Sequence, residues 1–237
     1  MMNFKGKGVA IAAMMTAAPA LAQTGGGNAE EGVYVQLDAG LATIGKVDIV
    51  YNDGVDRFGA SADLKNALTF GGAFGYDFGM LRTELQLSYA RNKVESLTVE
   101  SINGTAVTLT PAQRAEFCDY LEADTCTGSG ATVSVPDSRL RQLNAMGNVW
   151  LDIPTGAGVT PYVGGGVGAS GFELDGEGKV RFAWQIGGGV AFDLSEKMAL
   201  TADVRHRQVS GGDIDDGYAR VGRIKTTSFS AGIRFRF

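Results

Sequence analysis

The chain has 237 residues, of which 35 are glycine and only five are proline, and its formal net charge is −5 at pH 7. A chain this acidic is not an expected nucleic-acid binder, and its glycines follow no collagen-like three-residue repeat. Beyond the first residues no apolar run reaches the ~18 residues of a transmembrane helix, so the composition favours many strands and turns in one or two domains.

The first residues have the pattern of an export signal. Lys5 and Lys7 precede an apolar run over residues 9–18, and the small-x-small sequence Ala-Leu-Ala ends at Ala22. We predict a signal peptide over residues 1–22, followed by a short periplasmic linker over residues 23–31. The alternative is an N-terminal membrane anchor, for which the apolar run is too short to cross a bilayer as a helix.

Apolar and polar residues alternate along most of the remaining chain. In the first alternating segment Val33, Val35 and Leu37 share one face, and Gln36 and Asp38 share the other. A period of two predicts strands with one apolar and one polar face. The predicted strands cover residues 32–43, 67–78, 81–92, 138–153, 160–171, 180–194, 197–209 and 223–237. The alternation is weakest in 138–153, where Trp150 has the parity of the polar residues.

The connections between these strands differ in length at the two ends. Alternate connections are short turns, whereas the others cover residues 44–66, 93–137, 172–179 and 210–222. Short turns on one side, long loops on the other and an apolar face on every strand are typical of outer-membrane barrels. We predict an eight-stranded antiparallel up-and-down transmembrane β-barrel over residues 32–237, with its apolar face toward lipid. The alternative is a soluble periplasmic barrel of lipocalin type with its apolar face inside.

Charged residues of both signs have the parity of the barrel interior. Such a barrel is just wide enough for side chains to fill it, and unpaired buried charges are costly, so we expect these residues to form a paired network that closes the lumen. The alternative is a narrow solute channel. The predicted lumen network comprises Asp38, Asp77, Arg82, Glu84, Asp193, Asp203, Arg205, Arg207, Arg234 and Arg236.

The second long connection contains both cysteines. Thr110, Pro111 and Gln113 have the order of a helix cap, a first helical residue and a capping box, which predicts a short helix reaching Cys118. Because an exported chain passes through an oxidising compartment, we expect Cys118 and Cys126 to form a disulfide that folds the following segment back onto this helix. The alternative is two free thiols.

Several stretches, among them "NVWLDIPTGAGVTPYVGGGVGAS" and the final "FSAGIRFRF", resemble the family of small outer-membrane barrels that includes opacity-type surface antigens and OmpA/OmpX-type barrels. The resemblance implies a monomer in the cell outer membrane, in contact with lipid and lipopolysaccharide. It also implies that the last strand is the signal read by the barrel-assembly machinery. The residues of that signal are Phe229, Ile233, Phe235 and Phe237.

The function expected from this resemblance is a non-enzymatic surface protein that presents loops for adhesion to a host or cell-surface ligand, or for envelope integrity. The alternatives are a small-solute pore and a lipid A-modifying enzyme. His206 and Ser210 do not support the enzyme, because four residues of strand separate their side chains by ~13 Å, too far for a nucleophile–base hydrogen bond. We predict no catalytic, cofactor-binding or metal-ligating residues.

Basic residues gather near the long connections. Arginine binds phosphate well, so these side chains are candidates for contacts with lipopolysaccharide phosphates, and ordinary solvated charge is an equal alternative. The predicted lipopolysaccharide rim comprises Arg91, Arg139, Arg141, Arg181 and Arg223.

Overall fold

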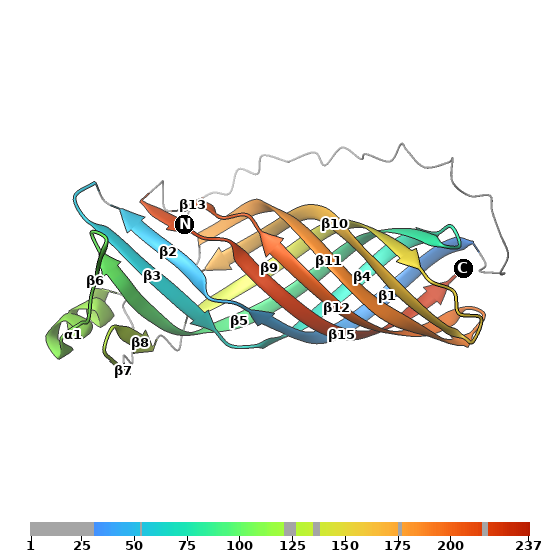
Figure 1. The fold of residues 1–237 in the computed structure, drawn as a ribbon, viewed down its shortest axis with the longest axis horizontal. Helices are drawn as coiled ribbons and strands as arrows, with labels where there is room; N and C mark the ends of the chain where they lie inside the picture. The colour runs from blue at the N-terminus through green and yellow to red at the C-terminus, as the bar shows by residue number, and fades with distance from the viewer. Residues whose placement is uncertain (1–30, 53, 121–126, 135–137, 175–176, 215–217) are drawn as a thin grey trace, which may run out of the picture.

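The computed structural model describes residues 31–52, 54–120, 127–134, 138–174, 177–214 and 218–237. The predicted signal peptide, and the linker up to residue 30, lie outside these residues. Within them, eight long antiparallel strands form a closed ring (Figure 1). These strands are β1 (Gly32–Ile44), β4 (Ala67–Asp77), β5 (Leu81–Ile102), β9 (Arg139–Asp152), β10 (Val159–Leu174), β11 (Glu177–Ser195), β12 (Met198–Val209) and β15 (Ile224–Arg236).

Each strand of the ring pairs with the next one along the chain, and β15 pairs with β1. The closing register sets Tyr34 opposite Arg236 and Leu41 opposite Phe229. Closure leaves no free edge in the ring, as a sheet within a bilayer requires. The predicted eight-stranded up-and-down barrel is therefore confirmed.

The apolar face of the strands points outward. Leu37, Phe70, Phe182 and Phe229 are between 55% and 60% exposed, whereas Gln36, on the opposite face, is 1% exposed. An apolar belt around a whole barrel is far larger than the patches that soluble proteins expose, and its natural solvent is lipid. The lipocalin-type alternative is therefore wrong, because it requires the apolar face to point inward.

The short turns and the long connections lie at opposite ends of the barrel, as predicted. We call the end with the short turns the periplasmic end and the other the outer end. The start of β1 and the end of β15 lie at the periplasmic end (Figure 1). Among the residues of the predicted assembly signal, Phe229, Ile233 and Phe237 are exposed on the outer surface of the barrel and Phe235 is half-buried.

Deleting Phe237 is expected to deplete folded barrel in cells while changing the finished barrel little. The Phe237 side chain is 77% exposed, and its backbone adds one hydrogen bond, from its amide to the Val33 carbonyl at 3.0 Å. The free energy of unfolding should therefore change by no more than about 1 kcal/mol. The measurement is the heat-modifiable band in outer-membrane fractions, with Phe237→Tyr as the control that keeps an aromatic end. Normal levels of the deleted chain in the membrane would contradict the assigned signal.

At the outer end the sheet continues where the sequence led us to expect irregular loops. The outer half of β5 pairs with β3 (Arg57–Leu64), which pairs with β2 (Val47–Asn52). β2 in turn pairs with β14 (Ala219–Val221), and β14 pairs with β13 (Gly212–Ile214). The short strands β6 (Thr105–Ala106) and β8 (Thr132–Ser134) pair with β5, and β7 (Gly128–Ser129) pairs with β8. The connections predicted at 44–66 and 210–222 keep these bounds to within one residue, because β1 ends at Ile44, β4 begins at Ala67, β12 ends at Val209 and β15 begins at Ile224. The connections predicted at 93–137 and 172–179 were too long, because β5 continues to Ile102, β10 continues to Leu174 and β11 begins at Glu177. Strand pairing satisfies the backbone groups beyond the belt as well.

Apolar side chains fill the interior at this outer end. Ile44, Val94, Phe172, Val209 and Ile224 are each no more than 5% exposed and belong to one cluster. We call this cluster the outer plug; its further buried members are Val47, Ala62, Leu140, Met146, Ala183 and Val221. The alternation of the strands did not indicate this cluster, because it predicts polar side chains throughout the interior.

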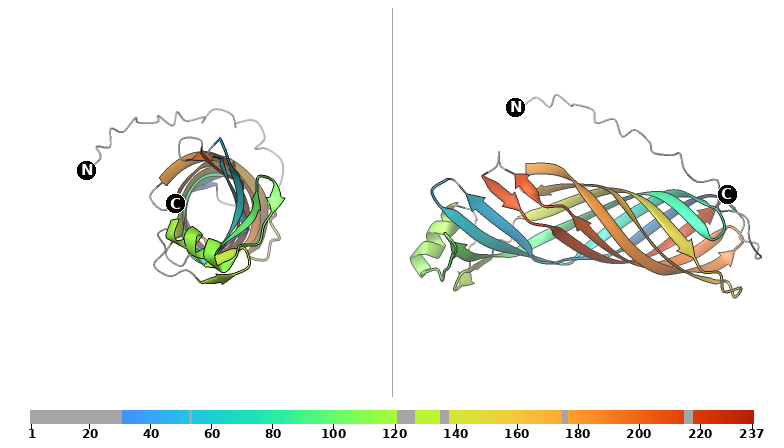
Figure 2. Two further views of the ribbon diagram at one scale, coloured as in Figure 1. Left: turned by 90° about the vertical axis from the view of Figure 1, so that its left-hand side faces the viewer. Right: turned by 45° about the horizontal axis from the view of Figure 1, so that its top comes forward.

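The helix expected in the second long connection is present as α1 (Pro111–Tyr120). Its capping box forms as predicted: the Thr110 amide donates to Gln113 Oε1 at 3.0 Å, and the Gln113 amide donates to Thr110 Oγ1 at 3.3 Å. Figure 2 (left) looks along the barrel from the outer end and shows α1 at the rim of the ring. Cys118 is buried on α1, and Cys126 lies outside the described residues, so their disulfide stays a prediction. No helix in the described ranges is long and apolar enough to cross a membrane.

Candidate functional site: the lumen and the outer rim

The periplasmic part of the lumen is closed by a buried ion pair. Arg82 Nε donates to Asp152 Oδ2 at 2.6 Å, and Arg82 Nη2 donates to Asp152 Oδ1 at 2.9 Å. Both side chains are almost completely buried, with 1% and 6% of their surfaces exposed. The Arg82 guanidinium also lies over the rings of Tyr162 and Tyr34, 4.8 Å and 5.5 Å from their centroids. A two-pronged pair flanked by aromatic rings fixes the guanidinium in one orientation.

Two further buried carboxylates in the lumen, those of Glu84 and Asp203, accept hydrogen bonds from tyrosine hydroxyls. The Tyr34 hydroxyl donates to Glu84 at 2.8 Å, and the Tyr162 hydroxyl donates to Asp203 at 2.6 Å. Arg205 Nη2 also donates to Asp203, at 3.3 Å. Each of these charges therefore has a partner from another strand or from its own strand, as buried charges require.

Toward the outer end the network continues through amides. Gln185 Nε2 donates to Asn148 Oδ1 at 2.7 Å and to Gln86 Oε1 at 2.8 Å. Arg207 donates from Nε and Nη2 to Gln185 Oε1 at 3.2 Å and 2.9 Å. Hydrogen bonds therefore cross the lumen between β5, β9, β11 and β12.

Glycines give the large lumen side chains their space. Tyr34 stands directly opposite Gly75, and Tyr162 stands directly opposite Gly189. A Cβ on Gly75 would lie 2.6 Å from the Tyr34 ring, and one on Gly189 would lie 2.8 Å from the Tyr162 ring. The high glycine content thus has a packing cause: a bare backbone on one strand admits an aromatic side chain from its neighbour.

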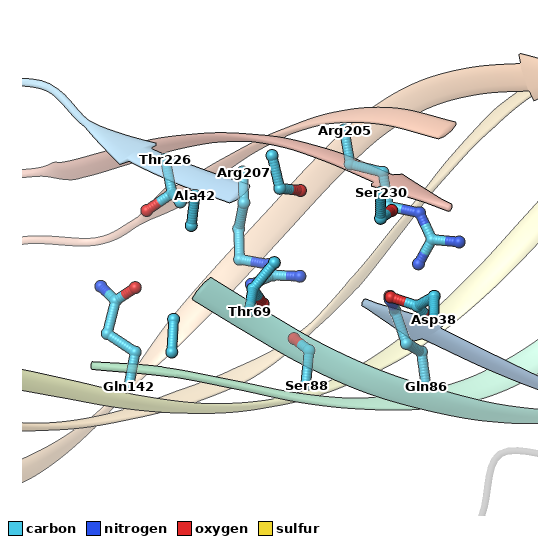
Figure 3. Close-up of a pocket in the computed structure, with 12 residues that line it drawn as sticks. Asp38, Ala42, Thr69, Gln86, Ser88, Gln142, Arg205, Arg207, Thr226 and Ser230 are labelled. Atoms are coloured by element: carbon cyan, nitrogen blue, oxygen red, sulfur yellow. The ribbon is translucent and has the colours of Figure 1, made fainter. Parts of the chain in front are cut away.

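A small polar cavity lies in the lumen, where Arg205 and Arg207 of the charged network line it together with polar side chains from the other strands (Figure 3). It is lined by Asp38, Thr69, Gln86, Ser88, Gln142, Arg205, Arg207, Thr226, Ser228 and Ser230, with Ala42 and Ala90. The volume open to the centre of a water molecule is about 10 Å³. That is roughly the space of one water molecule. Arg205 lines the cavity, and its buried Nε and Nη1 atoms have no hydrogen-bond partner among the described residues.

The residues of the predicted lumen network divide between the lumen and the periplasmic rim. Arg82, Glu84, Asp203, Arg205, Arg207 and Arg234 are buried inside, and Asp38 lines the cavity. Asp77 is buried at the first short turn, where its Oδ1 accepts a hydrogen bond from the Gly79 amide at 2.9 Å. Asp193 and Arg236 form a partly exposed ion pair of 3.2 Å at the rim.

The sequence analysis missed Asp152 and the three lumen aromatics Tyr34, Trp150 and Tyr162. Trp150 and Asp152 have the parity of Asn148 in β9, and all three are buried. That parity was the available signal: in a strand with polar residues inside, an aromatic residue on the polar face belongs inside as well.

His206 lies on the outer face of β12. Its Nδ1 is 3.0 Å from Thr227 Oγ1, and its ring centroid is 6.3 Å from that of Trp184. No described carboxylate contacts the ring, so the third group that orients a catalytic histidine is missing from the described residues. Nor do the described residues contain a group of three or more histidine, cysteine, aspartate or glutamate side chains that could hold a metal ion.

The predicted lipopolysaccharide rim is only partly one surface. Arg91 and Arg141 are direct neighbours across β5 and β9, and Arg139 follows two residues away on β9. Arg181 lies elsewhere: its Nη2 donates to the Asp213 carbonyl at 2.6 Å. Arg223 is exposed beside β15, three strands from β5 in the ring.

Comparison with known proteins identifies the family. The family described as "Outer membrane protein beta-barrel domain" matches residues 8–237. An uncharacterized protein of Brucella abortus (strain 2308) is 28% identical over 174 residues, which cover 63% of this chain and 54% of that protein. The chain thus spans about half the length of this curated relative.

Two solved structures have a similar fold. Neisserial surface protein A is 19% identical, with 86% of this chain and 97% of that chain covered and a TM-score of 0.46. The outer membrane protein OprG from Pseudomonas aeruginosa is 14% identical, with 87% and 96% covered and a TM-score of 0.49.

Proposed function

The chain belongs to the outer membrane protein beta-barrel family and lies in the outer membrane, and on this basis we propose that it is a non-enzymatic anchor for a surface structure made by its outer strands and α1. The observation that carries the proposal is the division of the molecule into a filled barrel and an extended outer sheet. The described part of the lumen contains the Arg82–Asp152 pair, a small polar cavity and the outer plug. Side chains therefore occupy the space that a transport pathway would need.

The outer sheet is the part available to a partner. β2, β3 and the outer half of β5 continue beyond the belt, and α1 lies at the end of this extension (Figure 2, right). We propose that this surface makes adhesive contacts with a host or another cell, and that the predicted Cys118–Cys126 disulfide holds α1 in place. We further propose that the chain is a monomer delivered by the barrel-assembly machinery.

Two measurements test this function: ion conductance through the barrel and attachment of cells that display the chain. In planar bilayers the purified full chain is expected to give no conductance steps, because both the ion pair and the outer plug would have to open. Cells displaying the full chain should attach to epithelial cells, and cells displaying a chain with residues 103–137 replaced by a short Gly-Ser turn should not. None of the removed strands belongs to the ring, so the barrel should remain.

The matched control is Glu196→Gln in a periplasmic turn, which should leave attachment unchanged. Surface levels of all three chains are compared with an epitope tag. Regular conductance steps, or equal attachment with and without residues 103–137, would contradict the proposed function. Conductance would instead support the small-solute pore.

A further inference from the structure

Four cationic side chains form a ladder on the outer surface of the barrel. Register sets Arg91 of β5 opposite Arg141 of β9, and Lys93 opposite Arg139. All four project outward, because the alternate residues Asn92, Leu140 and Gln142 are buried inside. We call Arg91, Lys93, Arg139 and Arg141 the cationic ladder.

Like charges in this arrangement oppose folding. Directly opposed side chains on neighbouring strands start only about 5 Å apart at their Cβ atoms, and like charges there destabilise the sheet. Arg141 has a partner, Glu173, whose Oε1 lies 2.9 Å from its Nη1. No described acidic side chain forms an ion pair with Arg91, Lys93 or Arg139.

The carboxylate near Lys93 is paired with a residue outside the ladder, and one guanidinium donor of the ladder lacks a partner among the described residues. Glu95, two residues beyond Lys93, is paired with Lys65 at 3.6 Å. Arg139 Nε is buried, yet it has no hydrogen-bond partner among the residues that the structure describes. The ladder therefore combines an excess of positive charge with guanidinium donors that the described protein leaves unused.

The position of the ladder relative to the apolar belt indicates which anionic ligand would bind to it. The rung immediately below consists of Tyr89 and Leu143, which are directly opposed and are 42% and 58% exposed. This rung belongs to the apolar belt, so the ladder begins where the belt ends. In the outer leaflet, the groups found at the upper edge of the acyl chains are phosphates on lipid. Guanidinium groups bind phosphate through paired, charge-assisted hydrogen bonds.

We propose that the cationic ladder binds the phosphate groups of a phosphorylated glycolipid of the outer leaflet. One lipid would lay its acyl chains along Tyr89 and Leu143 and place its phosphates between β5 and β9. The bound phosphate supplies negative charge beside Arg91, Lys93 and Arg139, which form no ion pair with a described acidic side chain. This site rests on the membrane location of the barrel and is independent of any adhesive role of its outer sheet.

The test uses the full chain in detergent and native mass spectrometry with bisphosphorylated lipid A as the probe. The double variant Arg91→Gln/Arg139→Gln should retain roughly tenfold less lipid A than the unaltered chain, as expected for the loss of charge-assisted hydrogen bonds. The control Arg220→Gln/Lys225→Gln removes the same charge from exposed side chains of β14 and β15, away from β5 and β9, and should change retention less than about twofold. Monophosphorylated lipid A should bind the unaltered chain more weakly than the bisphosphorylated form.

A second readout separates binding from general damage. In lipid-free detergent the ladder variant should melt at the same temperature as the unaltered chain or higher, because the substitutions relieve repulsion. On adding lipid A, the unaltered chain should gain more thermal stability than the ladder variant. Equal retention by the ladder variant and the control would overturn the proposal. So would a thermal shift with heparin and none with lipid A, which would assign the ladder to an anionic polysaccharide.

Discussion

Replacing Asp152 by alanine is expected to destabilise the barrel by about 3–5 kcal/mol, which is the usual cost of leaving a buried charge without its partner. Arg82 would keep its full charge, because a guanidinium does not lose its proton in proteins. It is 1% exposed, so water could not replace the lost carboxylate without entering the lumen. The measurement is urea unfolding in detergent micelles, followed by the mobility of unheated protein on a gel.

The rim pair provides a matched control for this variant. Asp193 and Arg236 also form an arginine–aspartate pair, but their side chains are 34% and 22% exposed. Asp193→Ala should therefore cost less than about 1 kcal/mol. The double variant Arg82→Met/Asp152→Leu should recover much of the loss, because apolar side chains of similar volume often replace a buried ion pair at little cost. Equal effects at Asp152 and Asp193 would show that the lumen pair is solvated.

Replacing Gly189 by alanine is expected to destabilise the barrel by about 1–3 kcal/mol, although it adds only one methyl group. The new Cβ would lie 2.4 Å from the Ala202 carbonyl oxygen and 2.8 Å from the Tyr162 ring. Displacing that ring would also weaken the 2.6 Å hydrogen bond from the Tyr162 hydroxyl to Asp203. The measurement is again the free energy of unfolding in detergent.

Gly147→Ala is the control for this substitution. A Cβ on Gly147 would meet only the Val167 carbonyl, at 3.8 Å, which is an ordinary contact. The free energy of unfolding should then rise or change by less than about 0.5 kcal/mol. In a Tyr162→Ala background the cost of Gly189→Ala should fall, because the ring that it displaces is gone. An unchanged cost in that background would place the strain in the backbone alone.

The Arg82–Asp152 pair and the cationic ladder lie on opposite faces of the same two strands, β5 and β9. Along β5, Arg82 and Glu84 point inward and bind across the lumen, whereas Arg91 and Lys93 point outward. A shift of one residue in strand pairing would exchange these faces and place charges against lipid. The charges therefore help to specify the register as well as to fill the barrel.

Much of the architecture could be predicted from the amino-acid sequence. Side chains alternate across a strand, so the parity of Gln36, Arg205 and Arg207 was enough to place them on the polar face. The contrast between short and long connections indicated the two ends of the barrel. The capping box of α1 could be predicted as well, because its hydrogen bonds join Thr110 and Gln113, only three residues apart.

Contacts between distant strands were decided only by the tertiary structure. Arg82 and Asp152 are 70 residues apart, and their pairing depends on the register between β5 and β9. The same register brings Arg91 opposite Arg141, whereas Arg181 forms its contact with the distant Asp213 carbonyl. Alternation gives the face of each residue, but its height in the barrel depends on how every strand is staggered when the ring closes. The outer plug follows the same rule, since its side chains come from the ring strands and from β2, β3 and β14, which pair beyond the belt.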